Sequence, residues 1–583
     1  MLHTLTRSLR ENKGPALVTV LLSALEVVFE IVIPLFMSNL IDFGIEGGSM
    51  AAVWKFGAFL LLLAAFQLST GVLAARIAAR ASVGFAANLR EDMYDNVQTF
   101  AFSNIDKFST ASIVTRLTTD TTNVQNAFQM LMRMAIRAPV MLIFSMIVSF
   151  RISRDISMTF LIILPILALA LFFIIRSVFP VFTRVFRTYD ELNNVVQENV
   201  RGIRVVKSFN QERHEIGKFG AISARIYQDF SKGERLITLN APLMQFCIYT
   251  CMIVISWLGA KAIIASGNDP ALGLTTGNLT ALITYTMQIL SSLMMLSMVF
   301  AMLTISLSSA RRIAEVLEER SDIPQPEQPV MTVRNGAVDF DHVSFVYASK
   351  ADKKVLDDID LHIRSGETIG IIGGTGASKS SLVQLIPRLY DVTGGKLTLG
   401  GVDVRDYDLD TLRGAVAMVL QKNELFSGTI AENLRWGNEN ATDEELRHAC
   451  ELACADGFIS AMPDGYDTHI EQGGTNVSGG QKQRLCIARA LLKKPKVLIL
   501  DDSTSAVDTR TDAQIQQALS TYIPDTTKII IAQRISSVQN ADRIVVLDDG
   551  HIDAVGCHDE LLRTCEIYRE VYESQQKGGE DDA

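Results

Sequence analysis

The chain is 583 residues long, more than one hydrophobic core usually organises, so two or three domains are expected. Hydrophobic residues make up 48% and charged residues only 20%, with a mean hydropathy of +0.23, an apolar excess that membrane-spanning segments would absorb. A formal net charge of −10, without clustered Lys and Arg, excludes nucleic acid as an expected partner.

Apolar stretches dominate the first half of the chain. Six of them are long enough to cross a bilayer, which takes about 20 helical residues. They cover 16–41, 54–75, 130–150, 156–179, 237–265 and 278–308. The first is too long for the apolar part of a secretory signal and no small-residue cleavage site follows it, so it is interpreted as a membrane helix. The seven cysteines are scattered without a CxxC pair and are expected to be reduced thiols.

Two of the connections between these stretches are long. The second-to-third and fourth-to-fifth connections run to about 55 residues each and are rich in Arg and Lys. Basic loops favour the cytoplasmic side, although the short loop RISRD, with Arg151 and Arg154, goes against this. Both long connections contain few Gly or Pro, so the membrane helices are expected to continue into the cytosol as two helical hairpins.

The second half of the chain has a different residue pattern. Three prolines break the helical pattern and mark a linker over 321–335: Pro324, Pro326 and Pro329. Short β-branched runs, then alternating strands and helices, predict an α/β domain over 336–575 with an initial antiparallel portion. The fold class is therefore an all-α, six-helix membrane domain over 1–320 with long cytosolic hairpins, followed by an α/β phosphate-loop domain. The polar, acidic end, 576–583, is expected to be disordered.

A glycine-rich loop follows the predicted strand TIGIIG. Its glycines let backbone amides turn toward phosphates, Lys379 brings a positive charge to the terminal phosphates, and Ser380 can bind magnesium. The residues predicted to bind ATP here are Gly373, Gly374, Thr375, Gly376, Ala377, Ser378, Lys379, Ser380 and Ser381. Ser378 stands where the pattern GxxxxGK[ST] has glycine. If that position needs a positive φ, serine costs about 1 kcal/mol.

Two further motifs follow the glycine-rich loop in the chain. Their order argues that the loop binds phosphate and is not a chance glycine-rich turn. The aliphatic run Val497–Leu500 predicts a buried strand that ends at Asp501 and Asp502. Asp501 fits the acid that binds magnesium opposite a phosphate loop. Between the loop and this strand, Ser478 and two glycines open a helix in NVSGGQKQR, which is again suited to an anion.

In these motifs the chain resembles the ATP-binding cassette (ABC) family, and specifically the exporter type with six membrane helices ahead of one cassette. The resemblance covers nearly the whole chain and implies ATP and Mg²⁺ as cofactors. It implies that Tyr347 stacks on adenine and that Gln421 joins Ser380 and Asp501 at magnesium. Four other motifs are carried over in the same way: a signature at Val477, Ser478, Gly479, Gly480 and Gln481; a D-loop at Ser505, Ala506, Val507 and Asp508; an X-loop at 471–474; and coupling segments at 102–120 and 198–212.

The resemblance also predicts how the chain assembles. In this family two cassettes enclose two ATP molecules, each between the phosphate loop of one and the signature of the other, so one cassette needs a second chain. The family places a catalytic glutamate and a switch-loop histidine where this chain has Asp502 and Gln533. The shorter acid lies about 1.5 Å further back, which can cost about 100-fold in rate, and glutamine carries no proton. Because the signature and D-loop are intact, we expect the degenerate subunit of a heterodimer; a slow homodimer is the alternative.

The sequence says least about the transported substrate. Glu26 and Glu30 lie one helical turn apart in the first membrane stretch, which indicates either cation recognition or a pair hydrogen-bonded to neighbouring helices. The sixth stretch is rich in methionine, including Met287, Met295 and Met298, which suits lipophilic ligands but also lipid-facing packing. The sequence thus favours a multidrug exporter of lipophilic or cationic compounds in a bacterial plasma membrane, with its cassette in the cytoplasm. A lipid flippase, a peptide exporter and an ATP-gated regulatory protein are the alternatives.

Overall fold

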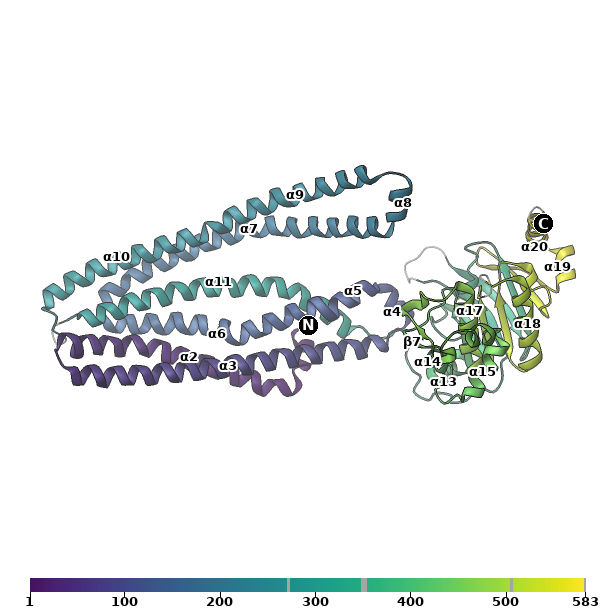
Figure 1. Cartoon of the computed structure of the whole chain (residues 1–583), viewed down its shortest axis with the longest axis horizontal. Coiled ribbons are helices and arrows are strands. Elements are labelled where there is room, and N and C mark those ends of the chain that lie inside the picture. Colours follow the sequence, from purple (N-terminus) through teal and green to yellow (C-terminus); the bar gives the residue numbers. More distant parts are fainter. Residues whose placement is uncertain (270–272, 348–353, 504–506, 581–583) are drawn as a thin grey trace. The chain divides into compact units, whose positions relative to one another are not determined.

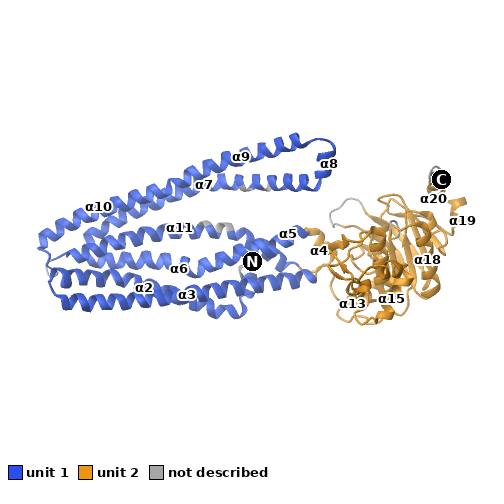
Figure 2. Ribbon diagram, in the orientation of Figure 1, with its two compact units in different colours: residues 1–98, 110–319 blue, residues 99–109, 320–583 orange. Residues whose placement is uncertain are grey.

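The computed structural model describes residues 1–583 except 270–272, 348–353, 504–506 and 581–583. The chain divides into two compact units, coloured separately in Figure 2. The first unit comprises Met1–Gln98 and Thr110–Glu319, and the second comprises Thr99–Ser109 and Arg320–Ala583. A short segment of the N-terminal half therefore packs with the C-terminal unit.

The first unit is made of helices, both short and long. They are α1 (Leu2–Arg7), α2 (Lys13–Asn39), α3 (Met50–Gln98), α5 (Thr110–Thr115), α6 (Thr121–Ile152), α7 (Arg154–Arg201), α8 (Ile203–Ser208), α9 (Glu212–Thr238), α10 (Asn240–Ser266) and α11 (Thr276–Glu318). Within the described part of the chain, six helical segments are long and apolar enough to cross a membrane, and each overlaps one of the six apolar stretches. The predicted six-helix membrane domain is confirmed.

The membrane helices are much longer than a bilayer is thick. α3 has 49 residues and α7 has 48, so each extends roughly 70 Å against a hydrocarbon core of about 30 Å. Figure 1 shows α7 and α9 running side by side to α8 at the tip of a hairpin. The fourth-to-fifth connection therefore forms an extended helical hairpin, as predicted.

Helices of the first unit pack against one another through buried apolar side chains. Val27 and Ile31 of α2 are buried with Met141 of α6 and with Ala281 and Tyr285 of α11. The Tyr285 hydroxyl donates a 2.6 Å hydrogen bond to the Ile31 carbonyl oxygen. A buried tyrosine needs such a partner, and this one fixes α11 against α2.

The second unit contains two main sheets in its described residues. The antiparallel sheet has the order β2-β1-β4-β5, and the larger sheet has the order β12-β11-β3-β10-β9-β6. The antiparallel strands are β1 (Val338–Phe345), β2 (Leu356–Ile363), β4 (Gly394–Leu399) and β5 (Val402–Asp403). The larger sheet contains β3 (Thr368–Gly373), β6 (Val416–Val419), β9 (Val497–Asp501), β10 (Thr527–Ile531), β11 (Arg543–Asp548) and β12 (His551–Gly556). A small pair, β7 (Gly428–Thr429) and β8 (His469–Ile470), completes the strands.

All pairings in the larger sheet are parallel except that of β12 with β11. Every residue of β9 and β10 is buried, as expected for parallel strands covered on both faces. The helices of this unit are α4 (Phe102–Lys107), α12 (Lys379–Gln384), α13 (Leu409–Ala415), α14 (Ile430–Arg435), α15 (Asp443–Leu452), α16 (Asp456–Ser460), α17 (Gly479–Leu492), α18 (Thr509–Tyr522), α19 (His558–Thr564) and α20 (Glu566–Glu580). The predicted α/β domain with an antiparallel portion is confirmed.

The last helix of the chain, α20, ends at Glu580, and residues 581–583 lie outside the described residues. The Gln576 side chain donates to the Tyr572 hydroxyl over 2.6 Å, one turn earlier on the same helix. The disorder expected of the segment 576–583 stays a prediction.

Candidate nucleotide-binding site

Three adjacent parallel strands deliver the candidate residues to one edge of the larger sheet. β10 lies between β3 and β9. The phosphate loop follows β3, Asp501 ends β9, and Gln533 comes two residues after β10. Because the carboxyl ends of parallel strands meet at the same edge, segments more than 100 residues apart in the chain converge there.

Backbone oxygens hold the lysine of the phosphate loop in place. Lys379 Nζ donates to the carbonyl oxygens of Gly373 and Gly374, each over 2.8 Å. A Cβ at Gly373 would lie 2.1 Å from the Leu547 carbonyl oxygen, so only glycine fits there. Burial lowers the pKa of Lys379, although Asp501 and Asp502 act in the opposite direction. The loop therefore places one ammonium group beside turned backbone, as phosphate binding requires.

Ser378 adopts the conformation on which its predicted cost depended. Its φ is +67° and its ψ is +21°, in the left-handed region, immediately before α12 begins at Lys379. The position thus needs a positive φ, and serine there is strained by about 1 kcal/mol relative to glycine.

Ser380 and Asp501 form a pair of oxygen donors. Ser380 Oγ donates to Asp501 Oδ1 over 3.1 Å, and Asp501 is only 3% exposed. Burial raises the pKa of Asp501, and Asp502 adds to the rise, while the bond from Ser380 and the charge of Lys379 oppose it. A hydroxyl and a carboxylate beside a phosphate loop fit Mg²⁺, which prefers oxygen ligands. When bound with ATP, that ion supplies positive charge against the phosphate oxygens.

Asp502 lies between two side-chain amides. Gln533 Nε2 donates to Asp502 Oδ2 over 2.8 Å, and Gln421 Nε2 lies 3.4 Å from the same oxygen. Asp502 is buried and has a φ of +47°. The structure therefore brings Gln533 and the predicted Q-loop glutamine Gln421 together at a single oxygen of Asp502.

The sequence reasoning missed a residue behind Gln533. Gln575 on α20 donates from Nε2 to the Gln533 carbonyl oxygen over 2.7 Å, and its Oε1 accepts from the Ile535 backbone amide over 3.0 Å. One amide side chain thus bonds the switch-loop backbone on both sides. No motif marks this glutamine, and only the packing of α20 reveals it.

Tyr347 lies beside the phosphate-loop helix. Its hydroxyl oxygen is 2.8 Å from Ser381 Oγ, and the side chain is 44% exposed. An exposed ring anchored at its hydroxyl end can still stack on a base.

The signature motif begins α17 in the way its sequence predicts. Ser478 Oγ accepts from the Gln481 backbone amide over 3.3 Å, and Gln481 Oε1 accepts from the Ser478 amide over 2.9 Å, a capping box. Ser478 and Gly479 are exposed. Across the described residues no hydrogen bond joins the signature to the phosphate loop, so the structure does not bring the two motifs of this chain together.

The D-loop is described in part. Val507 is buried, and Asp508 Oδ1 accepts from the Thr511 amide over 3.0 Å at the start of α18. Ser505 and Ala506 lie outside the described residues.

Comparisons with known proteins agree with this geometry. Residues 16–294 match the ABC transporter transmembrane region, and residues 356–505 match the ABC transporter family. The protein named "uncharacterized ABC transporter ATP-binding protein YfiB" of Bacillus subtilis is 35% identical over 558 residues, which cover 96% of each chain. This chain belongs to the ABC transporter family. A second relative, the "uncharacterized ABC transporter ATP-binding protein Rv1273c" of Mycobacterium tuberculosis, is 33% identical over 99% of this chain and 98% of its own.

A solved structure shows the same fold. The chain matches a bacterial Atm1-family ABC exporter with ATP bound with a TM-score of 0.80, 24% sequence identity, and coverage of 97% of this chain and 98% of that one. This ABC transporter is therefore an integral membrane protein with a cytosolic nucleotide-binding domain and an ATPase coupled to transport. ABC transporters of this type act as dimers in the bilayer, so a second chain is required.

In the membrane unit of this ABC transporter, the two predicted acids have a protein partner. Arg137 of α6 donates from Nη1 to Glu26 Oε1 over 2.8 Å and from Nη2 to Glu30 Oε2 over 2.7 Å. The structure thus provides the contact required by a structural pair, and cation recognition stays a prediction. An arginine inside the third apolar stretch was the overlooked sequence signal.

The predicted methionines are dispersed along α11. Met287 and Met298 are exposed in this protomer and Met295 is half-buried. None of them lines the cavities found in the described residues. Their role in substrate binding stays a prediction.

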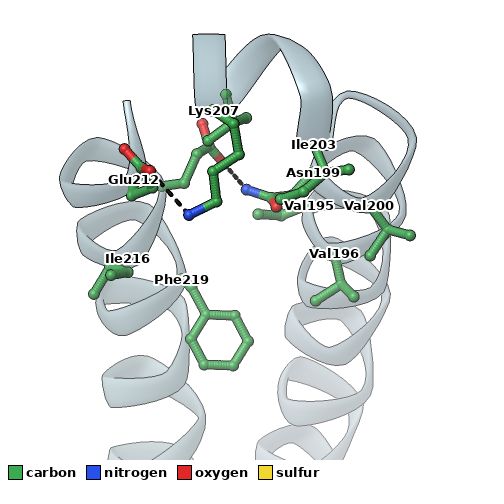
Figure 3. A pocket seen from close by; sticks show the side chains of 11 residues that line it. Val195, Val196, Asn199, Val200, Ile203, Lys207, Glu212, Ile216 and Phe219 are labelled. Atoms are coloured by element: carbon green, nitrogen blue, oxygen red, sulfur yellow. Dashed lines mark hydrogen bonds and ion pairs between the residues drawn. The ribbon is translucent and has the colours of Figure 1, made fainter. Parts of the chain in front are cut away.

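A cavity of about 350 Å³ lies at the tip of the second hairpin, among α7, α8 and α9 (Figure 3). Val195, Val200 and Ile216 line it, and Lys207 pairs with Glu212 over 2.9 Å at its rim. The tip coincides with the segment 198–212, which resembles a coupling segment. The cavity lining is mostly apolar.

Proposed function

We propose that this chain is one half of a heterodimeric exporter. Its own phosphate loop binds ATP and hydrolyses it slowly, and its signature completes the competent site of a partner chain. The observation that carries the proposal is the bond from Gln533 to Asp502, because it ties together the two positions where the family has its catalytic glutamate and histidine.

The binding half of the chemistry is supported by intact groups. Lys379 and the loop amides bind phosphate oxygens, and Ser380 with Asp501 provides oxygen ligands. Nothing in these contacts departs from a nucleotide site, apart from the strain at Ser378.

The hydrolytic half is weakened in two ways. A general base must accept a proton from the attacking water, but Asp502 Oδ2 already accepts from Gln533 and lies near the Gln421 amide. Gln533 itself cannot take up a proton or carry a charge. ATP bound by this loop is therefore expected to turn over slowly.

The signature argues for a partner with different properties. Its capping box is complete and its first residues face solvent, so the helix terminus is available to another chain's ATP. In a homodimer, both sites would contain the weakened acid. A heterodimer lets the intact signature serve a competent phosphate loop.

The cargo class we propose is lipophilic or cationic small molecules. The net negative charge of the Glu26–Arg137–Glu30 group and the exposed methionines of α11 support this class. A lipid flippase or a peptide exporter would use the same ATP-driven mechanism with a different cargo. ATP-dependent uptake of a fluorescent organic cation into inverted vesicles tests the class, and equal uptake without ATP would contradict it.

The ATPase of the purified full-length chain in lipid nanodiscs tests the heterodimer. We expect ATP binding that Lys379→Ala abolishes, with turnover that rises steeply only when the partner half-transporter is added. Robust turnover by this chain alone, lost on Asp502→Asn, would overturn the heterodimer proposal and show that Asp502 is a working base in a homodimer.

A further inference from the structure

The helix α4 packs within the cassette unit although it lies between membrane helices in the sequence. Thr99–Ser109 groups with Arg320–Ala583 (Figure 2). Phe102 stacks on Tyr390, with ring centroids 6.0 Å apart and planes at 28°. The Tyr390 hydroxyl donates to Asp106 Oδ2 over 2.7 Å. One cassette tyrosine thus contacts both ends of α4.

The same tyrosine contacts the residue proposed to stack on adenine. The rings of Tyr390 and Tyr347 lie 5.1 Å apart at 88°, an edge-to-face arrangement. Phe345, which is buried, contacts both, at 4.8 Å from Tyr347 and 5.6 Å from Tyr390. We call Phe102, Phe345, Tyr347 and Tyr390 the aromatic cluster. It joins Tyr347, the candidate adenine-stacking residue, to Phe102 of α4 through ring contacts.

Tyr390 is held firmly by its own segment. It follows the turn that leads out of α12, the phosphate-loop helix. Arg388 in that turn is 2% exposed and donates to both carboxylate oxygens of Asp391, over 2.7 and 3.1 Å. A bidentate pair of this kind fixes geometry as well as adding energy. The turn that precedes Tyr390 is therefore fixed by contacts that do not involve α4.

The tyrosine hydroxyl acts as a donor over the whole working pH range. Burial raises the pKa of Tyr390, and the bond to Asp106 adds to the rise. The Tyr390–Asp106 bond is therefore a neutral hydroxyl donating to a carboxylate acceptor.

We propose that Tyr390 is a positioning residue that couples the stacking of the adenine base on Tyr347 to the placement of α4. The inference rests on the proposed function, because it takes Tyr347 as the residue that stacks on the base. Its ligand is the purine base of the nucleotide, whereas the Gln421 contact lies at the phosphate end. Since α4 is covalently continuous with α3 and α5, an ordered base would restrain the segment of chain that connects these two helices.

The coupling must work in both directions. If a bound base favours one placement of α4, that placement favours the base by the same factor. A tyrosine that only fills space would leave base binding and α4 independent of each other. A coupling tyrosine and a space-filling tyrosine therefore predict different responses of α4 to the base of the nucleotide.

Hydrogen exchange of the full-length chain in nanodiscs separates the base from the phosphates. The backbone amides of 99–109 are followed without nucleotide, with ATP and with inorganic triphosphate, which has the phosphates but no base. We expect ATP to slow exchange in this segment by about fivefold or more, and triphosphate to have little effect. Equal protection by both ligands would overturn the proposal.

Two variants identify the tyrosine. Tyr390→Phe removes the bond to Asp106 and keeps the ring, so it should lose part of the base-dependent protection. Tyr390→Leu removes the ring contacts and should lose nearly all of it, with a weaker affinity for ATP but an unchanged affinity for triphosphate. Asp106→Ala should match Tyr390→Phe and add nothing to it, as expected for two members of one interaction.

Controls keep the proposal distinct from the function on which it rests. Tyr522→Leu, at an exposed tyrosine of α18, should leave the exchange pattern unchanged. Base-dependent protection that persists in Tyr390→Leu would overturn the proposal. If ATP binds neither the wild-type chain nor the variants, the proposed nucleotide site itself is wrong; if ATP binds normally without protecting α4, only the coupling is wrong.

Discussion

Gln533 donates a 2.8 Å hydrogen bond from its side-chain amide to Asp502 Oδ2. The contact joins two departures from the family pattern that are 31 residues apart in the chain. A shorter acid and an amide that bonds to it satisfy each other, so the two changes form one unit. Restoring the family residue at only one of the two positions leaves the other position without its hydrogen-bond partner.

The first prediction is non-additive recovery of catalysis. Asp502→Glu lengthens the acid but leaves Gln533, which cannot take a proton, and Gln533→His restores a proton carrier beside a short acid. We expect each single variant to raise kcat only a few-fold and the double variant to raise it about 100-fold, the scale of a misplaced catalytic group. Steady-state ATPase of the full-length chain measures this.

The control is the double variant combined with Lys379→Ala, in which recovered turnover should disappear. If the double variant is no faster than the better single variant, the two positions do not act as a unit.

The second prediction concerns Gln575. Its side chain bonds the backbone on both sides of the switch loop, at the Gln533 oxygen and the Ile535 amide. Gln575→Ala should therefore loosen the backbone at position 533 and lower kcat of the recovered Asp502→Glu, Gln533→His variant about tenfold, with KM for ATP nearly unchanged.

Gln576→Ala is the matched control, because Gln576 is the neighbouring glutamine and bonds Tyr572 on its own helix. An equal fall in kcat for both variants would show that α20 as a whole, and not Gln575, supports the loop.

The sequence predicted the elements that repeat a strong local pattern. The six membrane helices follow from long apolar runs, and the phosphate loop from glycine, lysine and serine at fixed spacing. The strand at Val497–Asp501 follows from four aliphatic residues before an acid, and all of it is buried. Each of these signals is contained in one short segment.

Contacts between distant segments carried no such signal. Gln575 reaches Gln533 only because α20 folds back along the sheet, and Arg137 reaches Glu26 from a separate membrane helix. The sequence also could not tell that Ser378 has a positive φ, because that depends on the loop geometry.

The third prediction is that Ser378→Gly stabilises the protein. Ser378 has a φ of +67°, which glycine adopts without strain, so the free energy of unfolding should rise by about 1 kcal/mol. Thermal unfolding of the purified chain, with and without ATP, measures the change.

Ser520→Gly supplies the matched control. Ser520 lies inside α18 and is exposed, so the same substitution there should lower the free energy of unfolding by about 0.5 kcal/mol. The same sign at both positions would refute the assignment of strain to Ser378.

The fourth prediction is a pH dependence at Glu367. Burial raises the pKa of this carboxyl, but bonds from Arg543 and from the Arg364 backbone amide outweigh it and leave the pKa below its usual range. A folded pKa below the unfolded value, about 4.3, gives stability that is present above that pH. It is lost as pH falls through the folded pKa.

Glu367→Gln should therefore lower Tm at pH 7 and differ less from the wild type as pH falls toward 4. Glu439→Gln, at an exposed loop position, is the control and should show little difference at either pH. A Glu367→Gln deficit that grows on acidification would contradict the sign.

The fifth prediction separates structure from cargo in the Glu26–Arg137–Glu30 group. Arg137→Gln leaves the two carboxylates of a partly buried group without their cation, and the loss of one partner from such a group destabilises the fold. We expect little folded protein. Glu26→Gln, Glu30→Gln and Arg137→Gln together remove every charge and should restore folding, because uncharged amides can bond each other.

The triple variant then tests cation recognition directly. In inverted vesicles it should export a neutral lipophilic dye like the wild type but transport a quaternary ammonium dye several-fold more slowly, because the net negative charge of the group is gone. Equal loss for both dyes would mean that the charges only organise the helices. Unchanged transport of both would remove Glu26 and Glu30 from the substrate path altogether.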